Sequence, residues 1–423
     1  MKLHRLIAGT SLLALGAGMA GAEELTLVEV ITSPERTEVL ESLVGAWEEE
    51  SGHSVEIVSL PWGQAFETLA TMVAGGDIPD VVEMPERWMA LYTGADQLVD
   101  LGPMVAAWED GETLTDQTVN MGSMTASGEL NMIPYGFYLR AMFYNKDLLA
   151  EAGVESPPET MEEFVAAAEA VSALDGKSGY CLRGGPGGTN GWLMFAATMN
   201  DSDRFFTDAG QSTITEPGSV EGLQMMIDLY QSGGAPRDSV NWGFNEIVAG
   251  FYSGTCAFLD QDPDALIGIA DRMDPESFAV MPMPTGPGGH AFPTIGYAGW
   301  SIFKATEHPD AAFDLVAHLS SPESNSTWAQ RVGVIPIHEG ADQDPYFQTE
   351  QFAGWFDTLN DPDTYRPLIV PSYLEGYGYF ADSLSIETAQ QALLGEITAE
   401  QLANIWGDFL TEEYAKYQAA GGQ

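Results

Sequence analysis

Positive charge is scarce in this sequence. Its 423 residues include 63 Asp and Glu but only 15 Lys and Arg, which gives a formal net charge of −48. Such a chain is repelled by the phosphates of nucleic acids and by anionic lipid surfaces, so a nucleic-acid partner is not expected. The acidic residues are scattered along the expected helices rather than gathered in runs. This favours a solvated acidic surface, with cation binding as the alternative.

Motifs of common metalloenzymes and hydrolases are also missing. No H-E-x-x-H, C-x-x-C or G-x-S-x-G occurs, and the histidines show no metal-ligand spacing. The sequence has six of them: His4, His53, His290, His308, His318 and His338. We therefore predict no catalytic residue, no metal and no cofactor.

Long apolar runs are nearly absent. The run from Leu6 to Met19 is too short to span a membrane as a mature anchor. It follows the basic residues Lys2 and Arg5, and the small residues 20–22 after it fit a signal-peptidase site. We predict a secretory signal over residues 1–22, a mature chain that begins at Glu23, and a periplasmic location. No cysteine lies near the cleavage site, so no stable membrane anchor is expected.

Only two cysteines occur, Cys181 and Cys256. An even pair in an oxidising compartment can form a disulfide, and both residues lie in predicted strands of one region. Such a bridge would stabilise the protein by on the order of 4 kcal/mol through its long loop. Two buried free thiols in neighbouring strands are the alternative, which the sequence leaves open.

The sequence does contain an alternation of strand and helix patterns. Near the N-terminus, apolar segments at 25–31, 54–60 and 78–84 are separated by segments with helical spacing of apolar residues. This order predicts a parallel α/β sheet with right-handed crossovers. A chain of 423 residues is too long for one ordinary core, so two or more lobes are expected.

The stretch from Pro134 to Asp147 has a period of two that is typical of a strand. Neither of its faces is polar, so we expect the strand to be covered on both sides. Arg140 lies in its middle and therefore needs a partner.

The end of this stretch is one of five segments that carry a family resemblance. In chain order they are Gly75–Val82, Tyr144–Leu148, Phe251–Phe258, Gly296–Trp300 and His308–Ala312. The ordered set resembles family 1 of the bacterial extracellular solute-binding proteins, the maltose-binding-protein-like sugar receptors of ABC importers. The resemblance implies an α/β, two-lobed periplasmic-binding-protein fold of type II. Each lobe should be a mostly parallel sheet flanked by helices, with hinge strands between the lobes.

The resemblance also implies a division of the chain. Lobe 1 should comprise residues 23–134 and 283–321, and lobe 2 residues 135–282 and 322–423. A monomer is expected, with a small-molecule carbohydrate as ligand and the permease subunits of an ABC transporter as partners.

Candidate ligand-binding residues in lobe 1 follow the three predicted strands. Ligands of open α/β sheets lie beyond the carboxyl ends of the strands. The residues expected there are Glu35, Arg36, Trp62, Gln64, Glu86, Arg87 and Trp88. Amides, carboxylates and guanidinium groups suit sugar hydroxyls, and aromatic faces suit the apolar side of a sugar ring. Glu86-Arg87 occupies the place of an acid–base pair that contacts sugar in the family, whereas Trp62 and Trp88 could equally be core residues.

Further candidates come from the rest of the chain. They are Tyr138 and Arg140 on the long strand, Trp192 after a glycine-rich stretch, Asp260 at a strand end, Tyr297, Trp300, Tyr373 and Tyr377. The glycine-rich stretch from Gly184 to Trp192 lacks the ending of a phosphate-binding loop, so a flexible loop facing the ligand is expected. Tyr373 and Tyr377 correspond to an aromatic subsite of the family, with packing of the C-terminal helices as the alternative.

These features predict a periplasmic receptor that closes around a sugar or oligosaccharide and delivers it to an importer. A polyol, a sugar phosphate, a uronate or a polyamine is the alternative ligand, and the anionic ones are considered because of Arg36, Arg87, Arg140 and Arg183. Acidic pairs are numerous, so the rival hypothesis from another class is a secreted carbohydrate-active enzyme with two carboxylates across a cleft.

Overall fold

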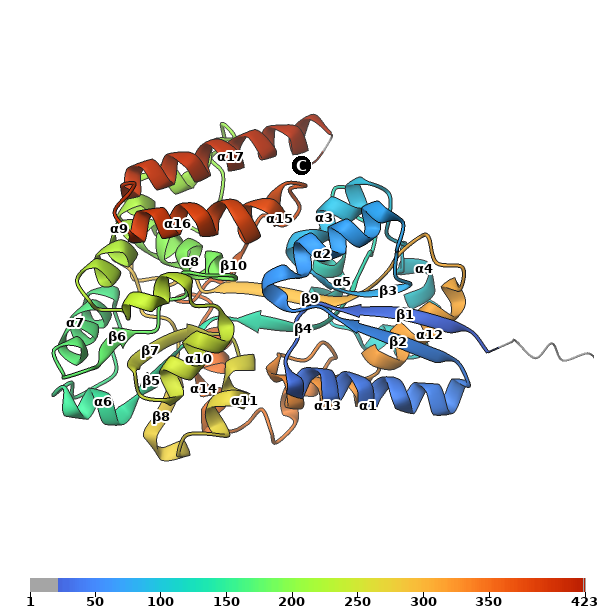
Figure 1. Cartoon of the computed structure of the whole chain (residues 1–423), viewed down its shortest axis with the longest axis horizontal. Coiled ribbons are helices and arrows are strands. Elements are labelled where there is room, and N and C mark those ends of the chain that lie inside the picture. The colour runs from blue at the N-terminus through green and yellow to red at the C-terminus, as the bar shows by residue number, and fades with distance from the viewer. Residues whose placement is uncertain (1–21, 421, 423) are drawn as a thin grey trace, which may run out of the picture.

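The structure is a computed structural model that describes residues 22–420 and residue 422. Two α/β halves are visible, each built around its own sheet (Figure 1). We use the name lobe 1 for the half that contains β1 to β3 and lobe 2 for the half that contains β5 to β8. The predicted signal lies outside the described residues, apart from Ala22. Within the described part of the chain, no helix is long and apolar enough to cross a bilayer.

The three predicted N-terminal strands form the parallel part of the first sheet. β1 (Glu24–Glu29) pairs in parallel with β2 (Ser54–Ser59) and with β3 (Val81–Pro85). β9 (Thr294–Ile302) joins β3 in the antiparallel direction, and the short β10 (Leu368–Ile369) pairs with the start of β9. Every residue of β3 and β9 is buried, as expected for central strands between layers of helices.

Helices of lobe 1 begin and end where capping residues occur. Ser33 accepts the backbone N–H of Arg36 at 3.3 Å, Pro34 opens the first helix, and Gly52 ends it with a positive φ of 78°. The helices of this lobe are α1 (Pro34–Ser51), α2 (Trp62–Gly75), α3 (Glu86–Gly94), α4 (Gly102–Val105), α5 (Asp116–Gly122), α12 (Pro309–Ser320) and α13 (Pro322–Trp328).

The long predicted strand is two strands in the structure. β4 (Ile133–Leu139) pairs with β9 in the first sheet, whereas β5 (Ala141–Asn145) belongs to the second sheet. Arg140 is the single residue between them. Its backbone N–H donates to Thr294 in lobe 1 at 3.0 Å, and its side chain bonds to Asp260 and Gln261 in lobe 2. The chain therefore passes between the lobes at Arg140, which has the partners that its burial requires.

The second sheet corrects one predicted feature, because it is not mostly parallel. Its order is β6-β7-β5-β8, with β6 (Ser178–Tyr180), β7 (Cys256–Gln261) and β8 (Phe278–Met281). β5 is antiparallel to both of its neighbours, β7 and β8, and among the adjacent pairs of this sheet only β6 and β7 are parallel. The reason is the path of the chain: β5 enters from lobe 1 and runs outward, whereas β7 and β8 run back toward lobe 1.

Lobe 2 contains most of the helices. They are α6 (Lys146–Glu151), α7 (Met161–Ser172), α8 (Thr189–Asn200), α9 (Pro217–Gln231), α10 (Phe244–Tyr252), α11 (Asp264–Ala270), α14 (Ala353–Asn360), α15 (Tyr377–Tyr379), α16 (Ser385–Leu393) and α17 (Ala399–Ala419). The capping boxes predicted from the sequence at Thr160 and Thr398 are present in the structure.

Residues 322–340 do not pack as the predicted division of the chain has them. They were assigned to lobe 2, but Asn325 donates to the backbone oxygen of Tyr135 in β4 at 2.7 Å. Ile335 pairs with Phe137, and His338 with Leu114, both in lobe 1. The chain then reaches lobe 2, where Trp355 packs edge-on against Phe143 of β5 at 5.5 Å between ring centroids.

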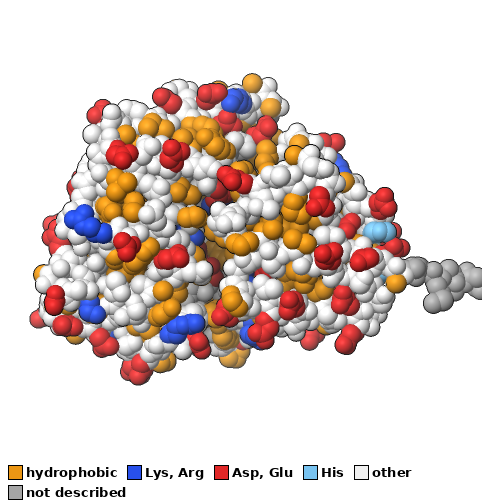
Figure 2. Space-filling view, viewed as in Figure 1, with side chains coloured by type: hydrophobic (Ala, Val, Ile, Leu, Met, Phe, Trp, Pro, Cys, Tyr) orange, Lys and Arg blue, Asp and Glu red, His pale blue; other side chains and the backbone are white. Residues whose placement is uncertain are grey.

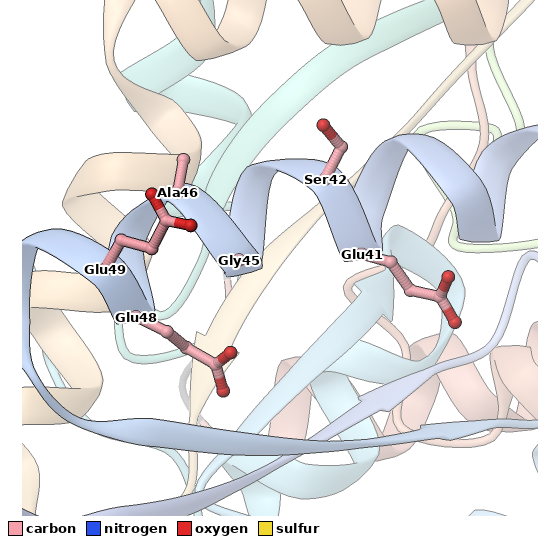
Figure 3. Close-up of a pocket in the computed structure, with 6 residues that line it drawn as sticks. All are labelled: Glu41, Ser42, Gly45, Ala46, Glu48 and Glu49. Carbon is pink, nitrogen blue, oxygen red and sulfur yellow. The ribbon is translucent and has the colours of Figure 1, made fainter.

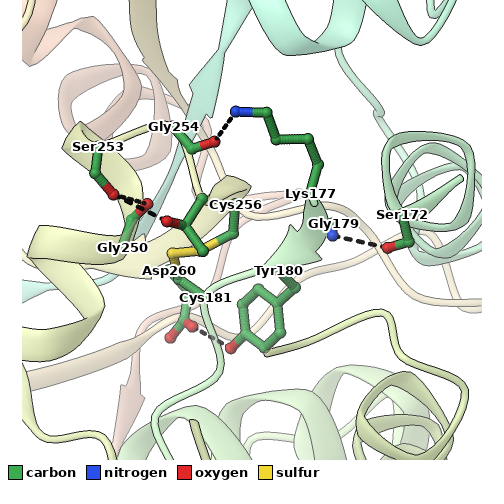
Figure 4. The surroundings of a disulfide bond; sticks show 11 residues. Ser172, Lys177, Gly179, Tyr180, Cys181, Gly250, Ser253, Gly254, Cys256 and Asp260 are labelled. Carbon is green, nitrogen blue, oxygen red and sulfur yellow. Dashed lines mark hydrogen bonds between the residues drawn. A yellow bond between two sulfur atoms is a disulfide. The ribbon is translucent and has the colours of Figure 1, made fainter. Parts of the chain in front are cut away.

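Cys181 and Cys256 are joined in a disulfide, so the free-thiol alternative does not apply (Figure 4). Their Cα atoms lie 5.5 Å apart although 75 positions separate them in the sequence. The bond ties the residue after β6 to the first residue of β7. It therefore anchors two neighbouring strands whose carboxyl ends face the other lobe.

Candidate ligand-binding cleft

A cavity of about 1200 Å³ lies between the lobes, and Figure 2 shows the surface hollowed there. Lobe 1 lines it with residues 31–36, 61–63 and 85–87, which follow the carboxyl ends of β1, β2 and β3. Lobe 2 supplies residues from 183–190, 241–252 and 261–272. The cavity is where ligands of open α/β sheets are expected, and it exceeds the roughly 300–1,000 Å³ of ordinary small-molecule pockets.

On the lobe 1 side, Arg36 is held by a buried network behind the wall. Its guanidinium bonds to Glu83 at 2.7 Å, to the Tyr135 hydroxyl at 3.0 Å and to the Tyr138 hydroxyl at 3.3 Å. Glu83 is fully buried and also accepts the backbone N–H groups of Val30 and Ile31. Arg36 and Tyr138, which both line the cleft, are thereby fixed in place.

Glu29 lies behind the same network and is also fully buried. Burial, and then the negative charge of Glu83, raise the pKa of Glu29 to about 7. The hydroxyls of Thr37 and Ser59 donate to one of its oxygens at 2.8 Å each, which partly offsets this effect.

Glu86 and Arg87 are the first two residues of α3. Nη2 of Arg87 lies 3.5 Å from Oε1 of Glu86, and Nη1 lies 3.3 Å from Oδ1 of Asp382. Nη2 also donates to the amide oxygen of Asn190 in lobe 2 at 3.5 Å. Burial raises the pKa of the Glu86 carboxyl, which the neighbouring Arg87 opposes. The Arg87 guanidinium lies 5.6 Å from the ring centroid of Trp62. A cation and an aromatic face are therefore presented together at this wall.

Arg140 is the centre of a third charged group, at the end of β7. Its Nη1 lies 3.2 Å from Oδ2 of Asp260, and its Nε lies 3.3 Å from Oδ1 of Asp262. The Tyr180 hydroxyl donates to Asp260 (Figure 4). Burial, and then the charge of Asp262, raise the pKa of Asp264 to about 7.

Eight of the predicted residues line this cleft together. They are Glu35, Arg36, Trp62, Glu86, Arg87, Tyr138, Arg140 and Tyr297. Trp62 stacks on Trp88 at 5.5 Å between ring centroids, so one indole lines the cavity and the other supports it from the core.

Four predicted aromatic residues lie in the core instead. These side chains are at most 1% exposed: Trp88, Trp192, Trp300 and Tyr377. Trp192 packs edge-on against Trp406 at 6.3 Å, and Trp300 packs against Trp328 at 5.8 Å. The expected flexible loop before Trp192 is shorter than predicted, because α8 already begins at Thr189 and buries the indole among helices.

Three further predicted residues also lie outside the cavity lining. Gln64 is exposed in the first turn of α2, which begins at Trp62 rather than after a loop. Asp260 is buried behind the wall, where Arg140 and Tyr180 use its oxygens. Tyr373 packs on Tyr417 of the last helix at 4.7 Å.

The lining of lobe 2 also contains polar residues beyond the fifteen predicted ligand contacts. Among them are Arg183, Asn190, Asn241, Asp262, Asp264 and Arg272. Arg183 follows the end of β6, and Asp262 and Asp264 follow the end of β7. Their position directly after a strand is the signal that locates them, because ligands of open α/β sheets lie beyond the carboxyl ends of the strands.

A second depression, of about 560 Å³, lies over α1 (Figure 3). Six residues of this one helix line it: Glu41, Ser42, Gly45, Ala46, Glu48 and Glu49. No other element of the described chain lines it, and Gly45 leaves space because it has no side chain. A single helix face with three carboxylates does not enclose a ligand, so the cleft between the lobes is the candidate site.

Residues 33–326 match the family described as bacterial extracellular solute-binding protein. A Brucella abortus (strain 2308) protein described only as a binding protein is 25% identical over 374 residues, 88% of this chain and 89% of its own. An arabinooligosaccharide-binding protein of Halalkalibacterium halodurans is 24% identical over 360 residues, 79% and 76% of the two chains. An sn-glycerol-3-phosphate-binding periplasmic protein of Pectobacterium atrosepticum is 25% identical over 236 residues, 51% and 50% of the two chains.

Solved structures show the same fold. A maltose-bound T. maritima protein superposes with a TM-score of 0.79 at 24% identity, over 92% of this chain and 99% of its own. An ABC transporter solute-binding protein of Thermotoga lettingae bound with α-D-tagatose gives a TM-score of 0.81 at 19% identity, over 93% and 100%. The two-lobed fold predicted from the sequence is thereby confirmed.

Proposed function

The chain belongs to the bacterial extracellular solute-binding proteins, and from this premise we propose that it is the periplasmic receptor of an ABC importer for a carbohydrate. The observation that carries the proposal is the composition of the cleft. The face of Trp62 and the side chains of Arg87 and Asn190 meet there from two lobes. Planar polar groups beside an aromatic face suit a ring that carries hydroxyls on its edge and C–H groups on its face.

Closure would be driven by contacts from both walls. A ligand shifts the equilibrium between open and closed forms only as far as it binds the closed form more tightly. A sugar that touches lobe 1 at Trp62 and lobe 2 at Asn190 or Asp262 meets this condition. The crossing at Arg140 would then act as one of the hinges.

The relatives support a small polar ligand without fixing its charge. The names of two of them specify an arabinooligosaccharide and sn-glycerol 3-phosphate. We propose that the protein is not an enzyme, acts as a monomer without a membrane anchor, and passes its ligand to permease subunits. Its cleft carboxylates Glu86 and Asp262 both lie beside arginines, which suits structural pairing more than a catalytic dyad.

The test is a thermal-shift and calorimetric screen of the mature chain from Glu23 against oligosaccharides, monosaccharides, polyols and polyamines. Ligand that binds only the folded state raises the melting temperature. We expect a shift with a carbohydrate that chromatography recovers intact. Trp62→Ala should reduce its affinity at least tenfold, whereas Tyr379→Ala, at an exposed aromatic residue outside the cleft lining, should leave it unchanged.

Three other outcomes would contradict the proposal. Recovery of cleaved sugar would favour the secreted enzyme. A shift with a polyamine alone would keep the receptor role and replace the carbohydrate. Equal effects of the two substitutions would remove Trp62 from the site.

A further inference from the structure

The cleft concentrates the few cations of this protein. Residues 23–423 contain 13 Lys and Arg, because Lys2 and Arg5 precede them. Six of these line the cleft, all of them arginines: Arg36, Arg87, Arg140, Arg183, Arg272 and Arg331. Six carboxylates line the same cleft, so its formal charge is neutral in a chain whose net charge is −48. The electrostatic environment of a ligand there differs sharply from that of the outer surface.

Most of these arginines already have an anionic partner. Four have a carboxylate oxygen within 4.0 Å: Arg36, Arg87, Arg140 and Arg272. Arg331 is exposed on the rim. Arg183 is partly buried, and it forms no salt bridge with any carboxylate whose side chain the structure describes.

The guanidinium of Arg183 is nevertheless fixed in position. Its Nε donates to the backbone oxygen of Pro186 at 2.7 Å, and its Cζ lies 5.8 Å from the ring centroid of Phe244. It packs directly against Gly187, where a Cβ would come within 2.2 Å of Nη2. Gly187 has a positive φ of 84° and no side chain, so this close approach is possible. The glycine-rich stretch therefore makes room for the Arg183 side chain.

The two terminal nitrogens of Arg183 have no acceptor among the described residues. The carboxylates nearby are already engaged: Asp262 with Arg140 at 3.3 Å, and Asp264 with the Gln261 amide at 3.4 Å. Burial, and then the positive charge of Arg140, lower the pKa of Arg183 to about 10. Asp264 and Asp262 oppose this lowering, but neither pairs directly with the guanidinium. A partly buried guanidinium without a direct ion-pair partner is costly, and an anion bound in the cleft would reduce that cost.

We infer that Arg183 binds an anionic group on the ligand, so that the transported solute is a sugar bearing a carboxylate or phosphate rather than a neutral one. This inference rests on the proposed carbohydrate-receptor function. The held Nε leaves Nη1 and Nη2 as a pair of parallel donors, and such a fork matches two oxygens of a carboxylate or phosphate. Trp62 and Asn190 remain available for the ring and its hydroxyls.

The experiment compares matched ligands by calorimetry with the mature protein. The pairs are glucuronate with glucose and galacturonate with galactose, and the phosphate arm uses glucose 6-phosphate and sn-glycerol 3-phosphate. We expect at least one anionic ligand to bind about 100-fold more tightly than its neutral counterpart. Whether the uronates or the phosphates bind more tightly then shows whether Arg183 prefers a carboxylate or a phosphate. Arg183→Gln should remove this preference, and Arg183→Lys should restore part of it.

Arg237→Gln is the matched control, because Arg237 is exposed outside the cleft lining and its loss changes the net charge equally. It should leave the anionic preference unchanged. Melting temperatures of all variants establish that they are folded. If neutral sugars bind as tightly as anionic ones and Arg183→Gln changes neither, the inference is wrong while the sugar receptor stands. If no sugar of either kind binds, the proposed function falls as well.

Discussion

The two walls of the cleft are held in different ways. Behind the lobe 1 wall, the Arg36–Glu83 pair is buried at 2.7 Å together with two tyrosine hydroxyls. Behind the lobe 2 wall, the Cys181–Cys256 disulfide ties β6 to β7. In lobe 1 the same arginine both stabilises the wall and faces the cavity, so its charge is already neutralised. In lobe 2 the wall is held by the disulfide and by the ion pairs of Arg140 with Asp260 and Asp262, so Arg183, two residues after Cys181, keeps its charge available for a ligand.

The largest effect is expected from breaking the lobe 1 network. Glu83→Ala leaves the Arg36 charge buried without a partner and also removes the acceptor for two backbone N–H groups. We expect a loss of about 5 kcal/mol in the free energy of unfolding, at the upper end for breaking a buried pair. Urea unfolding measures it. Lys304→Ala, which breaks the exposed Lys304–Asp96 pair from the lysine side, is the control and should change stability little.

If both variants unfold at the same urea concentration, the buried network does not hold lobe 1. The double variant Arg36→Met with Glu83→Leu sharpens the point. Because it leaves no unpaired buried charge, it should recover much of the stability that Glu83→Ala loses.

The corresponding change in lobe 2 is reduction of the disulfide. The double variant Cys181→Ala with Cys256→Ala should lose about 4 kcal/mol or less, since the bridge closes a long loop. Urea unfolding of the oxidised protein with and without dithiothreitol gives the same comparison. A reducing agent that shifts the transition of the double variant as much as that of the wild type would contradict this explanation.

A smaller effect is expected from the pH dependence of Glu29. Its folded-state pKa of about 7 lies above the unfolded value of 4.5, so folding favours the protonated form. Its contribution is therefore fully present below pH 4.5 and is lost as the pH rises through 7. The loss is on the order of 3 kcal/mol for a shift of this size.

Glu29→Gln is the variant that isolates this group. Gln cannot ionise, so the variant should lose less stability than the wild type between pH 5 and pH 8 in urea unfolding. Parallel pH profiles for the two proteins would show that another group causes the dependence.

The smallest effect is expected at Gln64, two residues after Trp62. Its side chain is exposed and does not line the cavity, so Gln64→Ala should change ligand affinity less than twofold in calorimetry. A loss comparable to that of Trp62→Ala would show that the first turn of α2 moves toward the ligand on closure.

Much of the fold could be predicted because apolar periodicity and capping residues act locally. The strands β1, β2 and β3 and the capping boxes of α7 and α17 follow from a few neighbouring residues each. The direction of β5 could not be predicted in this way. It depends on which lobe the chain leaves at Arg140, which is a property of the whole path.

The site shows the same division between local and distant causes. In lobe 1, the residues after each strand line the cleft, so position along the chain located Arg36, Trp62 and Arg87. In lobe 2, residue type is a poor guide: Trp192 is a large aromatic that the core also needs, and only its packing against the distant Trp406 separates the two roles. The ion-pairing state of Arg183 likewise depends on side chains far along the chain.

Arg140 also has a mechanical consequence. Its backbone is bonded to one lobe and its side chain to the other. Rotation of the backbone at this crossing is therefore restricted. A restricted crossing allows fewer directions of movement between the lobes than an unbonded linker would. We therefore expect the lobes to swing along one narrow arc, which would make reporter groups placed on the two rims suitable for a fluorescent sensor of this solute.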